Sequence, residues 1–274
     1  MSKSEILNYI YIFYQKFMCS KRLYKLNWVI YNLALRGIGV MNYQSMSLSG
    51  ENKFVEKVIG GMKNPVVIDV GAHTGDYSTK VKKENRNAKV FAFEPHSKTY
   101  EKLKKKGKKD NFYTIHSACG SREGKTTLYD YEEEGTSHAS IIGSVINDVH
   151  NENKISFEVP ITTLDSFTKS EDISVVDLLK IDTEGSEIEV IRGARKIINS
   201  GNIRCIQIEF NEMNVMSRTF LKDFVDLLED YIFFRMLPDG LVKLGKYTPK
   251  EYEIFGFQNI VAINEKEKYI LDKV

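Results

Sequence analysis

The chain has 274 residues, 42% of them hydrophobic, and a formal net charge of +2. A chain of this length and composition can bury a full hydrophobic core, either as one large domain or as one domain with an extension. The near-neutral charge argues against a dedicated nucleic-acid-binding protein, because the neutralisation of phosphates favours a marked basic excess.

The cysteines and the N-terminal apolar run indicate the cellular compartment of the protein. Cys19, Cys119 and Cys205 are odd in number and far apart, which is typical of free thiols in a reducing compartment and predicts a cytoplasmic protein. The apolar run over residues 6–14 is interrupted by Asn8 and is too short to span a bilayer. No small-residue cleavage site follows it, so we expect neither a signal peptide nor a transmembrane segment.

Residues 1–50 predict a helical extension before a domain over residues 51–274. Apolar side chains recur at helical spacing on both sides of Lys21-Arg22, which indicates two helices. The extension is basic up to Leu48, where one acid, Glu5, faces six basic residues: Lys3, Lys16, Lys21, Arg22, Lys25 and Arg36. We expect the helices to pack on the following domain as a lid or to form a homo-oligomer contact; peripheral contact with a membrane surface or a partner is the alternative. Ser49 is the expected N-cap of a short helix over residues 50–59.

From Pro65 onward, strand patterns alternate with helix patterns. This alternation predicts a Rossmann-like α/β fold: a mostly parallel sheet with helices on both faces and an antiparallel C-terminal edge. The expected parallel strands are residues 66–70, 89–93, 112–115, 175–181 and 203–210, and the expected helices are residues 77–84, 99–106, 186–198 and 220–228. A hairpin-like insertion is expected from strands 125–129 and 155–161 around a polar loop over 132–153, and the antiparallel edge from residues 231–234, 241–242 and 259–263.

The sequence VVIDVGAHTGDYS, from Val66 to Ser78, runs from an apolar strand into a glycine turn. Gly71 and Gly75 lack side chains that would block a ligand from the backbone, and Asp69 places a carboxylate at the strand end. Glu94 ends the next strand, where it can accept hydrogen bonds from two ribose hydroxyls. The turn lacks the Gly-x-Gly-x-x-Gly spacing of a dinucleotide site. Acids in place of phosphate-binding glycines suit a cationic sulfonium, which predicts S-adenosylmethionine (SAM) as cofactor and S-adenosylhomocysteine as product.

A second cluster, LLKIDTEG over residues 178–185, brings Asp182 and Glu184 to the carboxyl edge of the sheet. Lys180 lies inside the apolar strand and must either extend to solvent or pair with an acid. Glu209 ends the following strand, so several carboxylates can converge on one crevice. Taken singly, Asp182 is equally consistent with a helix cap and Glu184 with a first helical turn.

Methyl transfer to a hydroxyl group needs a base. Asp182 is the first candidate because it lies at the strand tip nearest the expected methyl position, and Glu184 and Glu209 are neighbouring acids. His138 in the polar loop is the second candidate. Oxygen ligands from Asp182, Glu184 and Glu209 could hold Mg²⁺, but one acid cluster is weak evidence and we expect no metal.

These segments, together with FAFEP, the TLDSF segment at residues 163–167 and IEFNE, resemble the FkbM-type SAM-dependent O-methyltransferases from about Gly37 to the C-terminus. The resemblance implies a class I methyltransferase fold that acts on hydroxyl groups, commonly of sugars in polysaccharides, glycolipids or antibiotics. It implies that the turn containing Asp69, Gly71, Ala72, His73 and Gly75 holds the methionine end of SAM, that Glu94 and Pro95 lie at the ribose, and that Ser117 and Ala118 lie beside the adenine. The helical stretch before Arg36 matches no motif of the family.

Three functions are consistent with the sequence. The first is a SAM-dependent O-methyltransferase that moves a methyl group to a sugar, another small molecule or a glycan by in-line displacement, with a carboxylate or His as base. The others are an RNA methyltransferase that uses the basic stretch over residues 102–109, and a non-catalytic SAM-binding scaffold. The near-neutral charge counts against RNA, and the intact acid set counts against an inactive protein.

Overall fold

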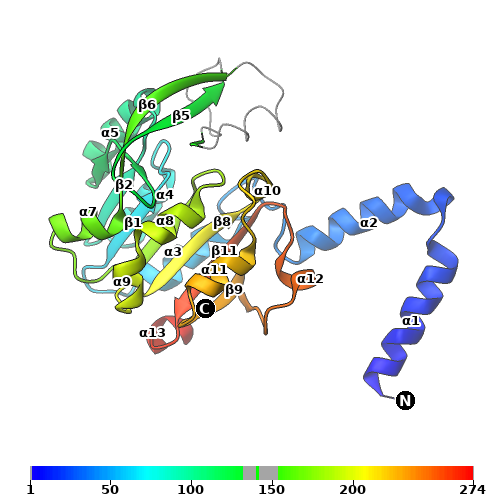
Figure 1. Ribbon diagram of the computed structural model, residues 1–274. Helices are drawn as coiled ribbons and strands as arrows, with labels where there is room; N and C mark the ends of the chain where they lie inside the picture. The colour runs from blue at the N-terminus through cyan, green and yellow to red at the C-terminus, as the bar shows by residue number, and fades with distance from the viewer. Residues whose placement is uncertain (1, 132–139, 142–153, 274) are drawn as a thin grey trace.

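The computed structural model describes residues 2–131, 140–141 and 154–273. The body is a Rossmann-like α/β fold, as the sequence predicted: an eight-stranded sheet with helices on both faces, beside a three-stranded sheet (Figure 1). A bent arm made of the first two helices extends away from this body (Figure 1).

The elements have the following bounds. The helices are α1 (Lys3–Met18), the 3-10 helix η1 (Lys21–Leu23), α2 (Tyr24–Gly37), α3 (Glu51–Ile59), α4 (Asp76–Glu84), α5 (Ser97–Asp110), α7 (Leu164–Ser170), α8 (Glu187–Gly193), α9 (Arg195–Asn199), α10 (Met213–Met216), α11 (Leu221–Leu227), α12 (Pro249–Tyr252) and α13 (Lys268–Leu271). The strands are β1 (Val66–Val70), β2 (Lys89–Phe93), β3 (Tyr113–Ile115), β4 (Ala118–Cys119), β5 (Gly124–Tyr131), β6 (Lys154–Thr162), β7 (Leu178–Ile181), β8 (Cys205–Phe210), β9 (Tyr231–Leu237), β10 (Gly240–Lys243) and β11 (Gln258–Asn264).

Five strands of the large sheet run parallel, in the order β8-β7-β1-β2-β3. β1 lies between β7 and β2, and four of its five residues are buried. A strand that is covered on both faces needs the continuous Val/Ile run seen here. The predicted bounds of β1 and β2 are confirmed, and the other parallel strands lie within a few residues of their predicted ranges.

The C-terminal part of the sheet is antiparallel, but its arrangement differs from the predicted edge pair. β11, the last strand in the sequence, lies between β8 and β9, and the hairpin of β9 and β10 forms the edge. All seven residues of β11 are buried, which suits a strand with neighbours on both sides. Burial depends on distant elements, so the short apolar run alone could not place this strand.

Two predicted helix boundaries were wrong. The helix expected over residues 186–198 is divided into α8 and α9, because the Asp165 carboxylate accepts hydrogen bonds from the Lys196 and Ile197 backbone N–H groups and so caps the second helix. The N-cap of α3 is Gly50 with φ +94°, whereas the Ser49 hydroxyl donates to Glu51. Both differences arise from contacts that local propensity does not contain.

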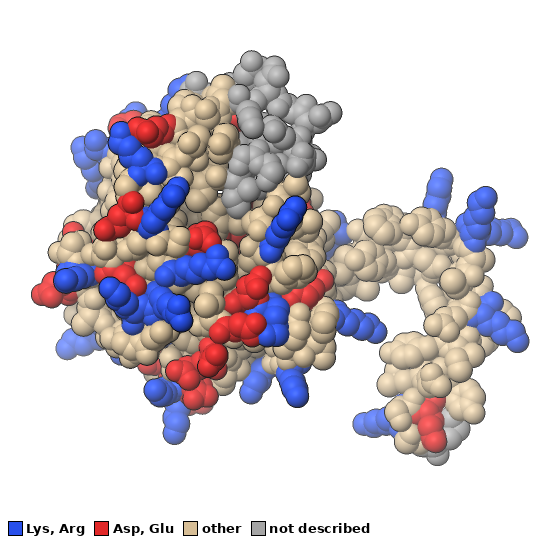
Figure 2. All heavy atoms as spheres, viewed as in Figure 1, with Lys and Arg blue, Asp and Glu red and all other residues tan. Residues whose placement is uncertain are grey.

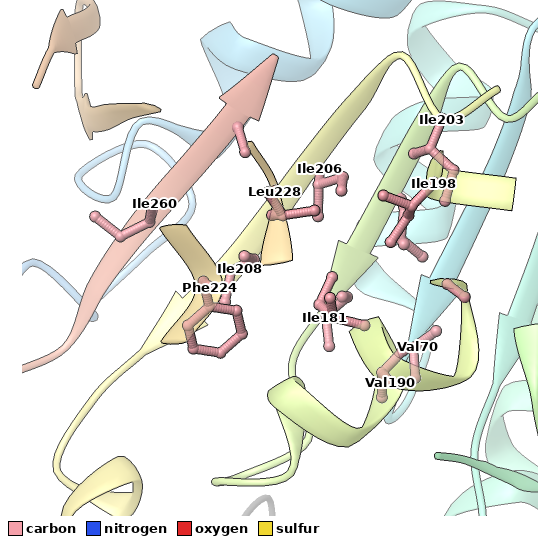
Figure 3. Packing of buried hydrophobic residues seen from close by; sticks show 14 of the residues in the cluster. Val70, Ile181, Val190, Ile198, Ile203, Ile206, Ile208, Phe224, Leu228 and Ile260 are labelled. Carbon is pink, nitrogen blue, oxygen red and sulfur yellow. The ribbon is translucent and has the colours of Figure 1, made fainter. Parts of the chain in front are cut away.

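The hydrophobic core lies on both faces of the large sheet. On one face, side chains of β1, β7, β8 and β11 pack against α8, α9 and α11, with Phe224, Ile208 and Ile260 close together (Figure 3). On the other face, α3, α4 and α5 cover the sheet. Phe224 and Phe210 are fully buried, and truncation of such a side chain to alanine costs about 3–5 kcal/mol. This packing holds the carboxyl ends of β1, β7 and β8 in place.

The expectation that α1 and α2 pack on the body is wrong. Every side chain of these two helices is exposed or only partly buried, and Figure 1 shows them projecting away from the sheet. The chain joins the body after α2: Val40 is fully buried, and the Met41 N–H donates to the Phe257 carbonyl at 2.7 Å. None of the helices in the described ranges has the length and the hydropathy that a membrane crossing requires.

Candidate active site

A cavity of about 310 Å³ opens at the carboxyl ends of β1, β7 and β8. Four regions line it: the turn after β1 with the start of α4, the ends of β7 and β8, the segment that joins the arm to α3 with the start of α3, and Phe257 before β11. The lining residues are Tyr43, Ser45, Met46, Ser49, Glu51, Gly71, Ala72, His73, Thr74, Asp76, Tyr77, Lys180, Asp182, Glu209 and Phe257. Open α/β sheets bind ligands at this edge. Of the predicted site residues, five line this cavity: Gly71, Ala72, His73, Asp182 and Glu209.

The turn after β1 is held against the end of β7. Gly71 has φ +79°, and a Cβ atom there would lie 1.7 Å from the Asp182 carbonyl oxygen. The backbone N–H groups of Gly71 and Ala72 donate to the Phe93 carbonyl. From the sequence, the absence of a side chain at this position was explained by the approach of a ligand. The structure shows that the close backbone of Asp182 by itself excludes a side chain here.

Gly75, the second glycine of the turn, serves the packing of α5. It has φ +86°, and a Cβ atom there would lie 2.7 Å from Leu103 Cδ1 and 3.0 Å from Phe112 Cζ. Gly75 is absent from the residues that line the described cavities. The observed contacts of Gly75 are thus with α5 and with Phe112.

Lys180 connects the carboxylates of two strands. Its Nζ lies 2.7 Å from Asp182 Oδ2 and 3.8 Å from Asp69 Oδ1, and all but 7% of its side chain is buried. Burial alone would lower the pKa of Lys180, but the charges of Asp182 and Asp69 outweigh that effect and raise it. Of the two alternatives that the sequence left open for this lysine, the structure shows pairing with acids.

Asp69 is fully buried and is hydrogen-bonded on one oxygen. Asp69 Oδ2 accepts from the Ser78 hydroxyl at 2.7 Å, while Oδ1 has no hydrogen-bond partner among the described residues. Burial raises the pKa of Asp69, and the charge of Lys180 opposes that rise. The carboxylate therefore keeps one oxygen for a further donor.

Glu94 ends β2 and connects the turn after β1 to the N-terminus of α5. Its carboxylate accepts the backbone N–H of His73 at 3.0 Å and that of His96 at 2.8 Å. Burial raises the pKa of Glu94 to about 7, although both backbone bonds act to lower it. Each carboxylate oxygen can accept more than one hydrogen bond, so these contacts leave capacity for hydroxyl donors.

A second, narrower cavity lies on the other side of Gly71. Apolar atoms form most of its wall, and Pro95, Ser117 and Ala118 are among the residues that line it. Its other lining residues are Val70, Gly71, Cys119, Leu128, Ile141, Thr183 and Ser186. Gly71 thus borders both this apolar slot and the first cavity, which we call the polar cavity because it contains the charged groups of Asp182, Lys180 and Glu209.

Asp182, Glu184 and Glu209 form an acid cluster in which one carboxylate oxygen of each residue lies within 4.8 Å of the corresponding oxygen of the other two. Burial, and then the charges of Asp182 and Glu184, raise the pKa of Glu209 well above its usual range. Asp182 and Glu209 line the polar cavity, whereas Glu184 does not. Asn211 Nδ2 donates to Glu209 at 3.0 Å and lies 3.4 Å from Glu184.

A buried polar network below the cavity was not found by sequence reasoning. Gln207 on β8 accepts from the Tyr77 hydroxyl at 2.6 Å and donates to Glu51 and Asn259, each at 2.9 Å. Burial raises the pKa of Glu51, and Lys180 opposes this. These residues come from four elements, and the only signal in the sequence is the polar Gln207 inside the apolar strand IQIEF.

Glu187 was also missed. This fully buried carboxylate accepts the backbone N–H groups of Thr183 and Gly185, each at 3.0 Å, as well as the Thr183 hydroxyl and Asn214 Nδ2. It fixes the loop that follows Asp182. An acid between Ser186 and Ile188 is typical of an exposed first turn of a helix, so its burial could not be predicted from the local sequence.

His138 lies outside the described residues, so its position relative to the cavity is not described. His73 has φ +47°, and its ring lines the polar cavity. His116 stacks on Tyr100 at 4.5 Å and approaches the Pro95 carbonyl oxygen at 3.0 Å. The TLDSF segment has a structural role: the Thr163 hydroxyl caps α7, and Asp165 caps α9.

Comparisons with known proteins identify the family. The model of the methyltransferase FkbM domain matches residues 69–233, more than half of the chain. The 2-O-methyltransferase NoeI of Sinorhizobium fredii (strain NBRC 101917 / NGR234) is 22% identical over 188 residues, which cover 65% of this chain and 76% of that protein.

Solved methyltransferase structures align with most of the chain at low identity. The precorrin-6y C5,15-methyltransferase of Geobacter metallireducens GS-15 has a TM-score of 0.41 and 15% identity, over 78% of this chain and 87% of its own. An rRNA methylase of Streptococcus thermophilus has a TM-score of 0.41 and 13% identity, over 78% and 93%. On the family match, the chain belongs to the FkbM methyltransferase family and is a SAM-dependent methyltransferase.

Proposed function

We propose that the protein transfers a methyl group from SAM to a hydroxyl group of a sugar or glycan. The observation that carries this proposal is the polar cavity, in which Asp182 and Glu209 face a shared space beside the Gly71 turn. A hydroxyl group is a poor nucleophile at neutral pH and needs a proton acceptor, which a cavity carboxylate supplies. SAM supplies an electrophilic methyl group on a cationic sulfonium.

The two cavities on either side of Gly71 fit the two ends of SAM. We assign the methionine end of SAM to Asp69, Ala72 and His73. Ala72 and His73 line the cavity, and the buried Asp69 Oδ1, 3.8 Å from Lys180 Nζ, has no hydrogen-bond partner among the described residues. Glu94 accepts the ribose hydroxyls. Pro95, Ser117 and Ala118 border the apolar slot, which suits an adenine ring.

Asp182 is the proposed base. Lys180 holds Asp182 Oδ2 at 2.7 Å, which limits the rotation of the carboxylate and leaves Oδ1 for the acceptor hydroxyl. Glu209, whose pKa is raised by burial and by neighbouring acids, is placed to take up the proton from the cluster. Glu184 does not line the cavity, but its negative charge helps to raise the pKa of Glu209.

A sugar acceptor is supported by the composition of the cavity wall. The wall combines hydroxyl and carboxylate groups of Ser45, Ser49 and Glu51 with the aromatic ring of Tyr43. A ring with apolar faces and hydroxyl edges matches such a mixture. The relative NoeI is named as a 2-O-methyltransferase, which agrees with transfer to oxygen.

The test is methyl transfer from isotope-labelled SAM to a panel of free sugars, nucleotide sugars, glycolipids and RNA, with the product analysed by mass spectrometry. An O-methyl ether on a sugar supports the proposal. Methyl transfer to RNA alone, or tight SAM binding without transfer to any acceptor, would assign the protein to one of the alternative functions.

A further inference from the structure

The arm formed by α1 and α2 carries most of the exposed large apolar side chains of the described molecule. Tyr9 and Phe13 in α1, and Trp28 and Leu33 in α2, are each between 56% and 65% exposed. The contiguous residues 9–14 are all large and apolar or aromatic, so the middle of α1 has no polar face. A helix that packs on one protein surface needs a single apolar stripe, whereas an all-round apolar helix needs surroundings that cover it on several sides.

Charge separates the possible occupants of this surface. Six basic residues and one acid lie between residues 1 and 48, and Figure 2 shows Lys and Arg side chains around the bend of an otherwise largely uncharged arm. Lys16, Lys21, Arg22 and Lys25 flank that bend. Packing against the arm of a second copy would bring these like charges together. An anionic lipid surface complements them, and each basic residue near such a surface contributes about 1 kcal/mol.

The dimensions of the arm suit attachment to one face of a bilayer. At 1.5 Å per residue, α1 is about 24 Å long and α2 about 21 Å, shorter than the hydrocarbon core of about 30 Å. The bend between them is fixed by side chains: the Tyr14 hydroxyl donates to Asn27 Oδ1 at 2.5 Å, and Asn27 Nδ2 donates to the Met18 carbonyl at 2.8 Å. Tyrosine recurs along both helices and Trp28 lies in α2; both residue types favour the membrane–water interface.

We propose that α1 and α2 bind the surface of an anionic lipid bilayer, with their apolar side chains in the interface and the basic residues of the bend at the lipid headgroups. The arm is anchored to the body by the buried Val40 and by the hydrogen bond from Met41 to Phe257. Tyr43 on the cavity wall lies six positions after Gly37, the end of α2, a span of at most about 22 Å. Docking of the arm therefore brings the active-site cavity to the membrane.

Trp28 gives a direct readout, because it is the only tryptophan of the chain. The full chain is titrated with vesicles of phosphatidylcholine containing phosphatidylglycerol, and with vesicles of phosphatidylcholine alone. We expect a blue shift of Trp28 emission and co-sedimentation with the anionic vesicles only. SAM affinity, measured in the same samples, confirms that the body is folded.

Two variants and a matched control separate the contributions. Lys21→Gln/Arg22→Gln/Lys25→Gln should weaken binding by roughly 10- to 100-fold, and Tyr9→Ser/Phe13→Ser should abolish it while the body keeps its SAM affinity. Lys105→Gln/Lys108→Gln/Lys109→Gln removes three exposed charges from α5 and should leave vesicle binding unchanged.

Each contrary outcome overturns the proposal in a recognisable way. A blue shift that depends on protein concentration without vesicles, with a dimer in analytical ultracentrifugation, would assign the arm to a second copy. Equal loss of vesicle binding in the α5 control would reduce the effect to unspecific charge. A monomer that binds no vesicle would leave no membrane role for the arm.

Discussion

Lys180 Nζ, on the buried strand β7, lies 2.7 Å from Asp182 Oδ2 and forms an ion pair with it at the rim of the active-site cavity. The same ammonium group lies 3.8 Å from the fully buried Asp69. One lysine thus compensates a carboxylate proposed to bind SAM and a carboxylate proposed to act on the acceptor. Its removal leaves both without their compensating cation.

Lys180→Met should lower the free energy of unfolding by about 3–5 kcal/mol, because removal of one partner leaves a buried charge uncompensated. Urea unfolding measures the change. Lys125→Met is the matched control: Lys125 pairs with Glu158 at the surface, and its removal should leave the stability near that of wild type. Equal losses in the two variants would mean that the Lys180 pair has no special energetic role.

Gly71→Ala should destabilise the fold by about 3 kcal/mol or more and weaken SAM binding. The backbone has φ +79°, and the added Cβ would lie 1.7 Å from the Asp182 carbonyl oxygen. Thermal unfolding and calorimetry with SAM measure both effects. Gly245→Ala is the control, since a Cβ at Gly245 meets no described atom within 4 Å. A stable Gly71→Ala protein with normal SAM affinity would contradict the close approach of the two loops.

SAM affinity should rise with pH around neutrality. The pKa of Glu94 is raised to about 7 in the free protein, and ribose hydroxyls donate to the ionised carboxylate. Below pH 7 a proton must leave before binding, so affinity should fall by about tenfold per pH unit there and level off above it. Calorimetry between pH 6 and 8 measures the profile.

Glu94→Ala should weaken SAM binding by roughly 2–4 kcal/mol and flatten this pH profile, because charge-assisted hydrogen bonds to the ribose are lost. Calorimetric titration of the variant with SAM between pH 6 and 8 measures both effects, and circular dichroism checks that the variant is folded. A wild-type profile that is flat, or a variant with unchanged SAM affinity, would remove Glu94 from the ribose site.

Asp182→Asn keeps the shape of the side chain but removes its capacity to take a proton. Turnover should fall by about 10²-fold or more, while SAM affinity changes little. Steady-state kinetics and calorimetry distinguish the two quantities. Full activity in Asp182→Asn together with loss of activity in His138→Ala would transfer the role of base to the loop histidine.

Methyl transfer should not require a divalent metal. The ammonium group of Lys180 already supplies a positive charge beside Asp182 in the acid cluster. Initial rates before and after treatment with EDTA measure the dependence. Activity that is lost on chelation and restored by Mg²⁺ would place a cation among Asp182, Glu184 and Glu209.

The sequence by itself determined the parallel half of the sheet and the residues at its carboxyl edge. Strands that are buried on both faces are continuous apolar runs, so β1 and β2 could be read directly. Asp69, Glu94, Asp182 and Glu209 each end such a strand, and parallel strands present their carboxyl ends at one edge. Local pattern and topology therefore agreed on where the site lies.

Only the tertiary structure decided the contacts between distant residues. Glu51, Tyr77 and Gln207 meet through hydrogen bonds across more than a hundred positions of sequence, and Glu187 is buried because α8 and the loop after β7 close over it. The position of β11 inside the sheet and the outward direction of α1 and α2 also depend on contacts, or on their absence, between distant parts of the described chain. Apolar periodicity predicts that one face of a helix or strand will be buried. The hydrophobic effect is non-directional, so the periodicity does not indicate which surface covers that face. That depends on the whole folded chain.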